Sequence, residues 1–185
     1  MRAVPLNRYF AFFLIAGGGL AADLATKRWC FGWLGSGGQI HWVLDKVFGF
    51  QTSLNEGALF GMGQGMVWLF ALLSIAAAVG ICWWLFLAGA ARQWLLTVAL
   101  AGIMAGVLGN LYDRLGLPGL KWTSANNLHN IGDPVYAVRD WILVMIGSYH
   151  WPNFNIADSL LVCGALLLVW HAFFQKDLKD GKTAA

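Results

Sequence analysis

The chain has 185 residues, of which 59% are hydrophobic and only 11% charged, and its formal net charge is +3. Soluble domains carry about 25% charged residues, so this composition argues against a soluble domain, and its high hydrophobic share argues against a disordered tail. The small net charge gives no phosphate-reading surface, so we expect no nucleic-acid partner. The three cysteines, Cys30, Cys82 and Cys163, have no metal-binding spacing and give no disulfide framework. An integral membrane protein remains, and the length suits a single domain over residues 1–185.

Four stretches are apolar and long enough to cross a bilayer, which requires about 20 residues. The predicted spans cover about 9–33, 66–90, 93–112 and 156–175. The first span has an alternative interpretation as a cleaved signal peptide, because Arg2 and Arg8 precede an apolar run. The other three spans make the protein integral in either case. The sequence therefore predicts an all-α membrane protein with four transmembrane helices.

Two longer segments between the spans, at about 34–65 and 113–155, are too polar to lie in lipid. The first is rich in Val, Phe, Trp and Thr, punctuated by Gly and Asn, which predicts short strands. Within the second, the apolar stretch from Trp141 to Ile146 predicts a half-helix lying at the membrane interface.

An even number of spans places both termini on one side of the membrane and both polar segments on the other. Six Lys or Arg lie on each side, so the raw count does not decide the orientation. The cations opposite the termini are spread over long loops or embedded in motifs, where the positive-inside bias counts less. We therefore predict cytoplasmic termini, with the terminal-side set Arg2, Arg8, Arg92, Lys176, Lys179 and Lys182 facing the cytoplasm.

Several polar residues gather at the ends of spans on the face opposite the termini, and each has two interpretations. Asp23 and Lys27 are four residues apart on one helical face, and they either form a structural ion pair or contact substrate. Asn110, Asp113 and Arg114 end the third span, where Arg114 either pairs with Asp113 or serves a site.

The remaining polar candidates lie in the two long segments and at the start of the fourth span. Asn55 belongs to NEGALFG, which is either a plain turn or a place where glycines allow close backbone approach. Asn155 and Asp158 either cap the fourth span or mark a site, because a carboxylate beside hydrocarbon is costly. Asp140, in AVRDW, is the other carboxylate that a strongly apolar stretch follows.

Two aspartates at one water–lipid boundary suggest an acid–base pair. Close carboxylates do not ionise together easily, so one of them keeps a proton near neutral pH. The ionised member takes a proton from water as the water attacks a carbonyl, and the protonated member polarises that carbonyl. The pattern gives less support to Ser-His, Cys-His or zinc chemistry, because no HExxH motif is present and the histidines are scattered at His41, His129, His150 and His171.

Five sequence blocks in this order resemble the lipoprotein signal peptidases (signal peptidase II), which are bacterial intramembrane aspartyl peptidases. The blocks are DLATK at 23–27, NEGALFG at 55–61, GNLYDR at 109–114, VRDW at 138–141 and FNIAD at 154–158. Any one block is weak evidence of kinship. Five in order on one predicted membrane face are specific, and with the span pattern the resemblance covers nearly the whole chain.

The resemblance implies a four-helix membrane fold with a small extracytoplasmic β-rich cradle and an interfacial half-helix, located in the bacterial cytoplasmic membrane. It implies removal of signal peptides from diacylglyceryl-modified prolipoproteins, just before the lipidated cysteine, with no metal or organic cofactor. It also implies contact with membrane lipids and a site that globomycin-like cyclic peptides occupy. Nothing in the sequence demands more than a monomer.

Carried over by motif, Asp140 and Asp158 would be the catalytic pair. The residues implied to line the site and hold substrate are Asn55, Asn110, Arg114 and Asn155, and those implied to support the architecture are Asp23, Lys27 and Asp113. The segment 115–139 is longer than the family leads us to expect, and Asp133 within it competes with Asp140. Asp140 is preferred because VRDW fits the block, and we hypothesise that the extra length forms a lid.

Two other classes of membrane protein have to be weighed against a peptidase. A small proton-coupled transporter would relay protons through Asp23, Asp113 and Asp158, with carboxylates near the bilayer midplane and on both sides. The clustering at one predicted boundary argues against it. A structural membrane subunit would tolerate Asn in place of Asp140 and Asp158 without effect.

Overall fold

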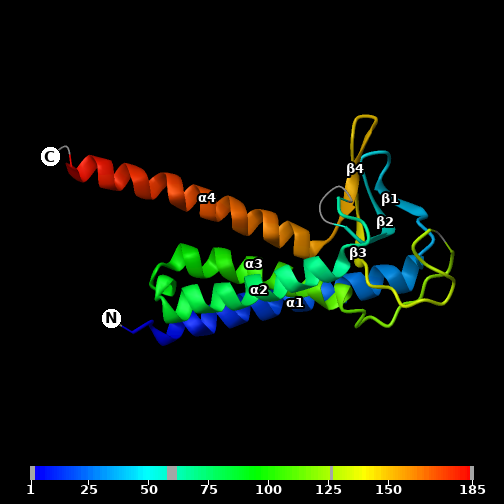
Figure 1. Cartoon of the computed structure of the whole chain (residues 1–185). Coiled ribbons are helices and arrows are strands. Elements are labelled where there is room, and N and C mark those ends of the chain that lie inside the picture. The colour runs from blue at the N-terminus through cyan, green and yellow to red at the C-terminus, as the bar shows by residue number, and fades with distance from the viewer. Residues whose placement is uncertain (1–2, 58–61, 126, 184–185) are drawn as a thin grey trace.

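The computed structural model describes residues 3–57, 62–125 and 127–183, with side chains described up to residue 173. Within these ranges the chain forms four long helices and a four-stranded sheet. Figure 1 shows the sheet at one end of the helices and both termini at the other end. Some residues named in the sequence analysis lie outside the described part. They are Arg2, residues 58–61 of the NEGALFG block, and the side chains of Lys176, Lys179 and Lys182.

The four long helices are apolar and long enough to cross a membrane. They are α1 (Leu6–Leu34), α2 (Val67–Cys82), which a π-helical turn extends to Leu87, α3 (Trp94–Arg114) and α4 (Ile156–Thr183). At about 1.5 Å per residue, the 21 residues of α3 extend roughly 32 Å, close to the thickness of the hydrocarbon core. The described residues contain four candidate spans, so the prediction of four transmembrane helices is confirmed.

Helix α3 is the centre of the bundle, because it is buried over most of its length while α1, α2 and α4 turn most of their surface outward. Glycines let the backbones meet at this centre. A Cβ at Gly106 of α3 would lie 2.4 Å from the main-chain oxygen of Ala157 in α4, and one at Gly164 of α4 would lie 2.5 Å from Ile103. Small residues at such contacts are typical of helix packing in membranes, where close approach replaces the hydrophobic effect.

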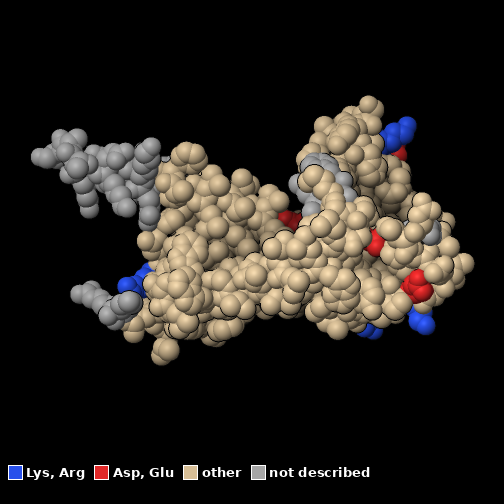
Figure 2. Space-filling view, viewed as in Figure 1, with Lys and Arg blue, Asp and Glu red and all other residues tan. Residues whose placement is uncertain are grey.

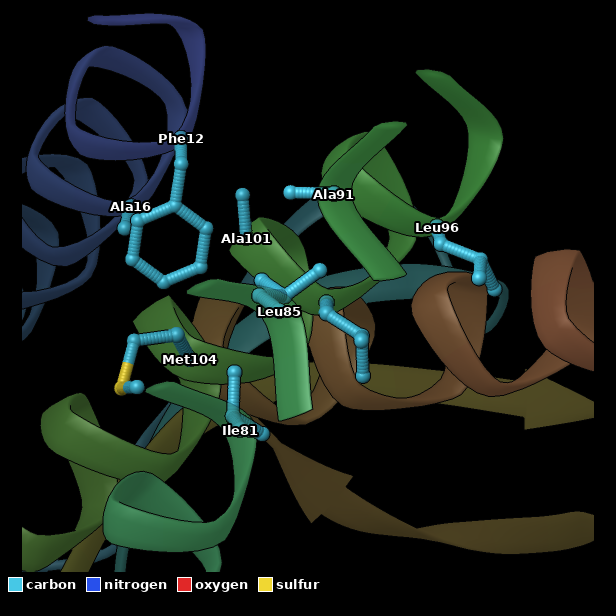
Figure 3. Packing of buried hydrophobic residues seen from close by; sticks show 9 residues of the cluster. Phe12, Ala16, Ile81, Leu85, Ala91, Leu96, Ala101 and Met104 are labelled. Atoms are coloured by element: carbon cyan, nitrogen blue, oxygen red, sulfur yellow. The ribbon is translucent and has the colours of Figure 1, made fainter. Parts of the chain in front are cut away.

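A cluster of buried apolar side chains joins α1, α3 and the turn after α2 near the terminal end. Figure 3 shows Phe12 of α1 beside Ala101 of α3, with Leu85 next to them. The outer faces carry large exposed apolar side chains instead, among them Phe10, Leu72 and Leu166. The helical part seen in Figure 2 is almost free of charged atoms between its two ends, as expected of a surface that faces lipid.

The sheet is antiparallel throughout, with the strand order β1-β2-β3-β4. The strands are β1 (Ile40–Leu44), β2 (Phe48–Asn55), β3 (Val138–Ile146) and β4 (Tyr149–Phe154). Both polar segments contribute to it, because β2 from the first pairs with β3 from the second. The predicted strands of the first segment are thereby confirmed, and the register sets Ser53 opposite Asp140.

The predicted half-helix at Trp141–Ile146 is wrong, because these residues belong to strand β3. Gly147, with φ of 62°, and Ser148 form a two-residue turn that pairs Ile146 with Tyr149 and creates the hairpin β3–β4. Strands on both sides of β3 satisfy its main-chain groups, and Trp141 and Ile142 pack in a cluster with Cys30 of α1. Pairing and packing therefore decide in favour of a strand over a run that is apolar enough for either structure.

Candidate active site

A pocket of about 730 Å³ opens between the sheet and the adjoining ends of α3 and α4. The sequence candidates that line it are Asn55, Asn110, Arg114, Asp140 and Asp158. Acidic atoms are visible at the bottom of the notch between the helical body and the sheet in Figure 2. The structure therefore brings together residues from β2, β3, α3 and α4 that are up to 103 positions apart in the sequence, as Asn55 and Asp158 are.

Asp140 lies in β3 and is 2% exposed. Its two carboxylate oxygens accept hydrogen bonds from separate amides, Oδ1 from Asn155 Nδ2 at 2.7 Å and Oδ2 from Asn55 Nδ2 at 3.3 Å. Burial raises the pKa of Asp140 well above its ordinary value, and the charge of nearby Asp158 raises this pKa further. Asp140 therefore keeps its proton to a higher pH than an ordinary aspartate does.

Asp158 lies in the first turn of α4, where the positive end of the helix dipole favours a carboxylate. Its Oδ1 accepts a hydrogen bond from Asn110 Nδ2 at 2.8 Å, and its Oδ2 accepts one from the main-chain N–H of Asn155 at 3.2 Å. Asn155 Oδ1 in turn accepts the main-chain N–H of Asp158 at 2.9 Å, as a helix cap does. Asn155 therefore caps α4 and also contacts the carboxylate of Asp158.

Asn155 connects the two aspartates. Its side-chain amide donates to Asp140 and its main chain donates to Asp158. The same Nδ2 lies 3.2 Å from Asn110 Oδ1, which also accepts a hydrogen bond from Lys27 Nζ at 3.1 Å. Because an ammonium group can only donate, Lys27 fixes the oxygen side of the Asn110 amide and turns its Nδ2 toward Asp158.

Four buried charges lie beneath the pocket and neutralise one another. Lys27 Nζ lies 2.8 Å from Asp23 Oδ2 and 3.0 Å from Asp113 Oδ2. Arg139 Nη2 lies 2.8 Å from Asp113 Oδ1, which also accepts a hydrogen bond from Arg139 Nε at 2.8 Å. A buried ion pair is weak evidence of stability, because desolvation offsets the attraction, but it specifies geometry closely when every group is paired.

This charge cluster (Asp23, Lys27, Asp113 and Arg139) holds the two segments that carry the aspartates. Asp23 Oδ1 accepts the main-chain N–H of Ala157, the neighbour of Asp158, at 2.9 Å. Asp113 Oδ2 accepts the main-chain N–H of Arg139, the neighbour of Asp140, at 3.1 Å. Members of the cluster thus contact the residue adjacent to each aspartate, although none of them lines the pocket.

Arg114 is turned toward the pocket, not toward Asp113. Its Nη2 donates a hydrogen bond to the main-chain oxygen of Gly57 at 3.3 Å, and its guanidinium lies 5.3 Å from the centre of the Phe70 ring. The simple alternative, an Arg114–Asp113 pair, is not what the structure has, because Asp113 is bound by Lys27 and Arg139.

Sequence reasoning missed several residues of this region. Arg139 stands in the VRDW block but was given no role there, although successive strand residues point to opposite faces and the neighbour of a pocket aspartate is therefore directed toward the bundle. Gln51 and Asn153 form another part of the pocket wall, where Asn153 Nδ2 donates to the main-chain oxygen of Gln51 at 2.8 Å. This contact depends on the β3–β4 hairpin, which the sequence analysis did not predict, so the contact could not be predicted either.

Asp133, the competitor of Asp140, lies away from the pocket. Its Oδ2 accepts the main-chain N–H of Asn130 at 2.7 Å, within its own loop. Of the described residues between 115 and 137, none lines the pocket, so this part of the insertion does not cover it as a lid. Asp23, Asp113, Asp140 and Asp158 all lie at the sheet end of the helices, unlike the two-sided arrangement expected of a transporter.

Comparisons with known proteins show which sequences and structures this chain is similar to. Residues 13–174 match the family model described as signal peptidase (SPase) II. A lipoprotein signal peptidase of Rhodopirellula baltica is 46% identical over 188 aligned residues, covering 97% of this chain and 79% of the relative. One of Bacillus velezensis is 32% identical, covering 91% of this chain and 97% of the relative. A solved structure described as a bacterial membrane enzyme superposes with a TM-score of 0.74 at 26% identity, covering 91% of this chain and 90% of that one.

Proposed function

This chain belongs to the signal peptidase II family, and on that premise we propose that Asp140 and Asp158 are the catalytic pair with which it cleaves lipoprotein precursors. The function is that of a lipoprotein signal peptidase, an aspartic endopeptidase in a multi-pass membrane protein. One observation carries the assignment of the pair: Asn155 donates a hydrogen bond to each of the two carboxylates at the pocket. The substrates are prolipoproteins, cleaved just before the diacylglyceryl-modified cysteine.

The first chemical step uses the different environments of the two carboxylates. Asp158, ionised at the positive end of α4, accepts a proton from a water molecule whose oxygen attacks the scissile carbonyl carbon. Asp140, whose pKa is raised by burial and by the charge of Asp158, donates its proton to the carbonyl oxygen. The product of this step is a neutral tetrahedral diol, with Asp158 protonated and Asp140 ionised.

The second step returns both protons and restores the pair. Asp158 gives its proton to the amide nitrogen as the carbon–nitrogen bond breaks, and Asp140 recovers a proton from one hydroxyl of the diol as the carbonyl re-forms. The signal peptide leaves with a new carboxyl group, and the lipidated cysteine leaves with a free amine. No covalent enzyme intermediate and no cofactor are needed for this cycle.

The walls of the pocket suit a substrate that is half peptide and half lipid. Asn55, Asn110, Arg114 and Asn155 present amide and guanidinium groups at or directly beneath the pocket, where they hold substrate main-chain or lipid-linked polar groups. Val107, Leu161 and Val162 form an apolar wall on the helix side, which favours acyl chains. Globomycin-like cyclic peptides would occupy this same pocket.

The charge cluster of Asp23, Lys27, Asp113 and Arg139 serves as architectural support in this proposal, because it holds Ala157 and Arg139 beside the two aspartates. The whole chain, residues 1–185, acts as one domain and as a monomer in the membrane. Its termini face the cytoplasm and its pocket faces the extracytoplasmic side, in contact with membrane lipids.

Cleavage of a diacylglyceryl-modified prolipoprotein by the purified protein tests the catalytic pair. Asp140→Asn and Asp158→Asn should each reduce kcat by at least ~10³-fold, because each removes one proton-transfer group while keeping the side-chain volume. Asp133→Asn is the matched control, since Asp133 is a carboxylate of the insertion outside the pocket. It should retain full turnover, and all three variants should keep the affinity for a globomycin-like peptide within a few-fold.

Other outcomes would identify the alternatives. Full turnover in Asp140→Asn together with loss in Asp133→Asn would show that the pair is misassigned. Unchanged turnover in both pocket variants would remove these aspartates from the reaction.

A further inference from the structure

The insertion between α3 and β3 is folded back on itself around Trp122. The main-chain N–H of Trp122 donates to the oxygen of Asp133 at 2.9 Å, and the oxygen of Trp122 accepts the N–H of Gly132, also at 2.9 Å. A third main-chain hydrogen bond, from Val135 to Leu120 at 3.0 Å, closes the base of the loop. These hydrogen bonds bring the two ends of the loop together, at residues 120–122 and 132–135.

His129 projects from this loop to the segment that enters the active site. Its ring is stacked on the Trp122 ring, with centroids 4.4 Å apart and planes only 6° from parallel. Its Nε2 lies 2.6 Å from Oε1 of Glu56, and the two side chains are 18% and 9% exposed. Stacking therefore orients a ring nitrogen at a nearly buried carboxylate that follows β2.

Glu56 lies between two residues that line the pocket, while it does not line the pocket itself. On one side, Asn55 Nδ2 donates to Asp140 Oδ2 at 3.3 Å. On the other side, the main-chain oxygen of Gly57 accepts a hydrogen bond from Arg114 Nη2 at 3.3 Å, and the N–H of Gly57 donates to Asn55 Oδ1 at 3.0 Å. Any rotation of the main chain at Glu56 therefore displaces the groups that contact Asp140 and Arg114.

We propose that His129 is a positioning residue for catalysis, which holds Glu56 and through it sets Asn55 against Asp140. This inference rests on the proposed catalytic role of the aspartate pair. The insertion thereby supplies a partner for Glu56, and neither Glu56 nor His129 lines the pocket itself. Trp122 contributes to the same positioning, because its ring is stacked on the His129 ring and sets its orientation.

The test compares His129→Ala, Glu56→Ala and the double variant in turnover of a diacylglyceryl-modified prolipoprotein by the purified full-length protein. Each single variant should lower kcat by about tenfold with KM within twofold of wild type, because the acid–base geometry changes while the substrate contacts remain. The double variant should be no slower than the slower single variant, because both changes break one contact. Ser124→Ala, at an exposed position of the same loop, is the control and should have wild-type kcat.

Two further measurements separate positioning from a general effect on folding. The variants should lose kcat without a matching fall in Tm, because the His129–Glu56 contact joins two segments that lie outside the helices and strands. Glu56→Gln keeps the volume and an acceptor for His129, so its kcat should lie between those of wild type and Glu56→Ala. This milder change also gives a usable variant if an alanine variant fails to fold.

Three results would overturn the inference: wild-type kcat in His129→Ala, a rise in KM alone, or losses that multiply in the double variant. Failure of the proposed function itself is distinct, because it would appear as turnover surviving in Asp140→Asn. Full kcat in His129→Ala with an inactive Asp140→Asn would reject only the positioning role.

Discussion

The two aspartates differ at the residue scale in what surrounds them. Asp140 is buried in the sheet and accepts hydrogen bonds from the neutral amides of Asn55 and Asn155, whereas Asp158 lies in the first turn of a helix whose dipole favours its charge. Such a difference separates an acid from a base within one pair of chemically identical groups. Asn155 donates a hydrogen bond to each of the two carboxylates, from its side chain to Asp140 and from its main chain to Asp158.

The raised pKa of Asp140 predicts how activity and stability depend on pH. Because Asp140 acts in its protonated form, kcat should fall as the pH rises through this raised pKa.

Ionising the buried Asp140 carboxyl also lowers the free energy of unfolding. The contribution of protonated Asp140 to the free energy of unfolding is fully present below the ordinary Asp pKa of about 3.9. It is lost as the pH rises through the higher pKa of the folded state.

Thermal unfolding of Asp140→Asn measures the same effect without turnover. Asparagine does not ionise, so the Tm of this variant should rise relative to wild type as the pH increases through that window. A Tm difference that stays constant with pH would show that Asp140 is not the group whose ionisation is suppressed.

At the scale of elements, the bundle is closed by glycines on α3 that admit the neighbouring helices. Gly109 lies against the charge cluster, where an added Cβ would be 2.5 Å from Asp23 Oδ2 and 3.1 Å from the Cβ of Ala157. Gly102, two turns earlier on the same helix, has only ordinary space around it, with the nearest contact at 3.7 Å from the oxygen of Leu160. On α3, Gly109 is therefore a position at which to test close helix approach, and Gly102 is its control.

Gly109→Ala should destabilise the protein by about 1–3 kcal/mol and lower kcat, because the methyl group displaces Asp23 and with it the start of α4. Gly102→Ala should leave kcat unchanged and stabilise α3 by up to about 1 kcal/mol, since alanine is the better helix former. Thermal unfolding and turnover check both. Equal behaviour of the two variants would show that close approach at Gly109 is not required.

The elements that the sequence predicts correctly are those that have a local signal. The spans follow from length and hydropathy, and β1 and β2 follow from aromatic and β-branched residues between turn residues. The prediction for β3 was wrong because an apolar run of this length suits a helix or a strand. The residues Gly147 and Ser148, which lie between β3 and β4, are themselves a hairpin signal. The Glu56–His129 contact has no sequence signal at all, because it joins residues 73 positions apart through an insertion.

The sequence motifs contain the candidate site residues and three members of the charge cluster, Asp23, Lys27 and Asp113. Asn55, Asn110, Asp140 and Asp158 each stand in a block that resembles the family, and the structure gathers them in one pocket. Arg139 was missed as a partner of Asp113, because only the pairing of β3 with β2 turns it toward α1 and α3. Positions in motifs were thus accessible from the sequence, whereas second partners required the fold.

For the whole molecule, the described Lys and Arg side chains at the two ends of the helices differ in their surroundings. At the sheet end, Lys27 and Arg139 are neutralised by Asp23 and Asp113, so they add little to the net positive charge on that side. At the terminal end, Arg8 lies 3.6 Å from the centre of the Trp94 ring, in the amphipathic setting typical of a membrane interface. The proposed orientation therefore depends on the cations close to the span ends on the terminal side, which the positive-inside bias places in the cytoplasm.

Reporter fusions test this orientation. Alkaline phosphatase, which is active only outside the cytoplasm, should be inactive when fused after Ala185 and active when inserted at Ser124, in the loop at the sheet end. The reverse pattern would place the pocket on the cytoplasmic side and would contradict the proposed orientation.

In the proposed reaction the two aspartates act as one unit, and the residual turnover of the double variant Asp140→Asn/Asp158→Asn measures whether they do. Groups that share one proton cycle are strongly non-additive, so the double variant should cleave lipidated prolipoprotein no more slowly than either single variant. Losses in kcat that multiply, or a single variant with near wild-type kcat, would contradict the shared cycle.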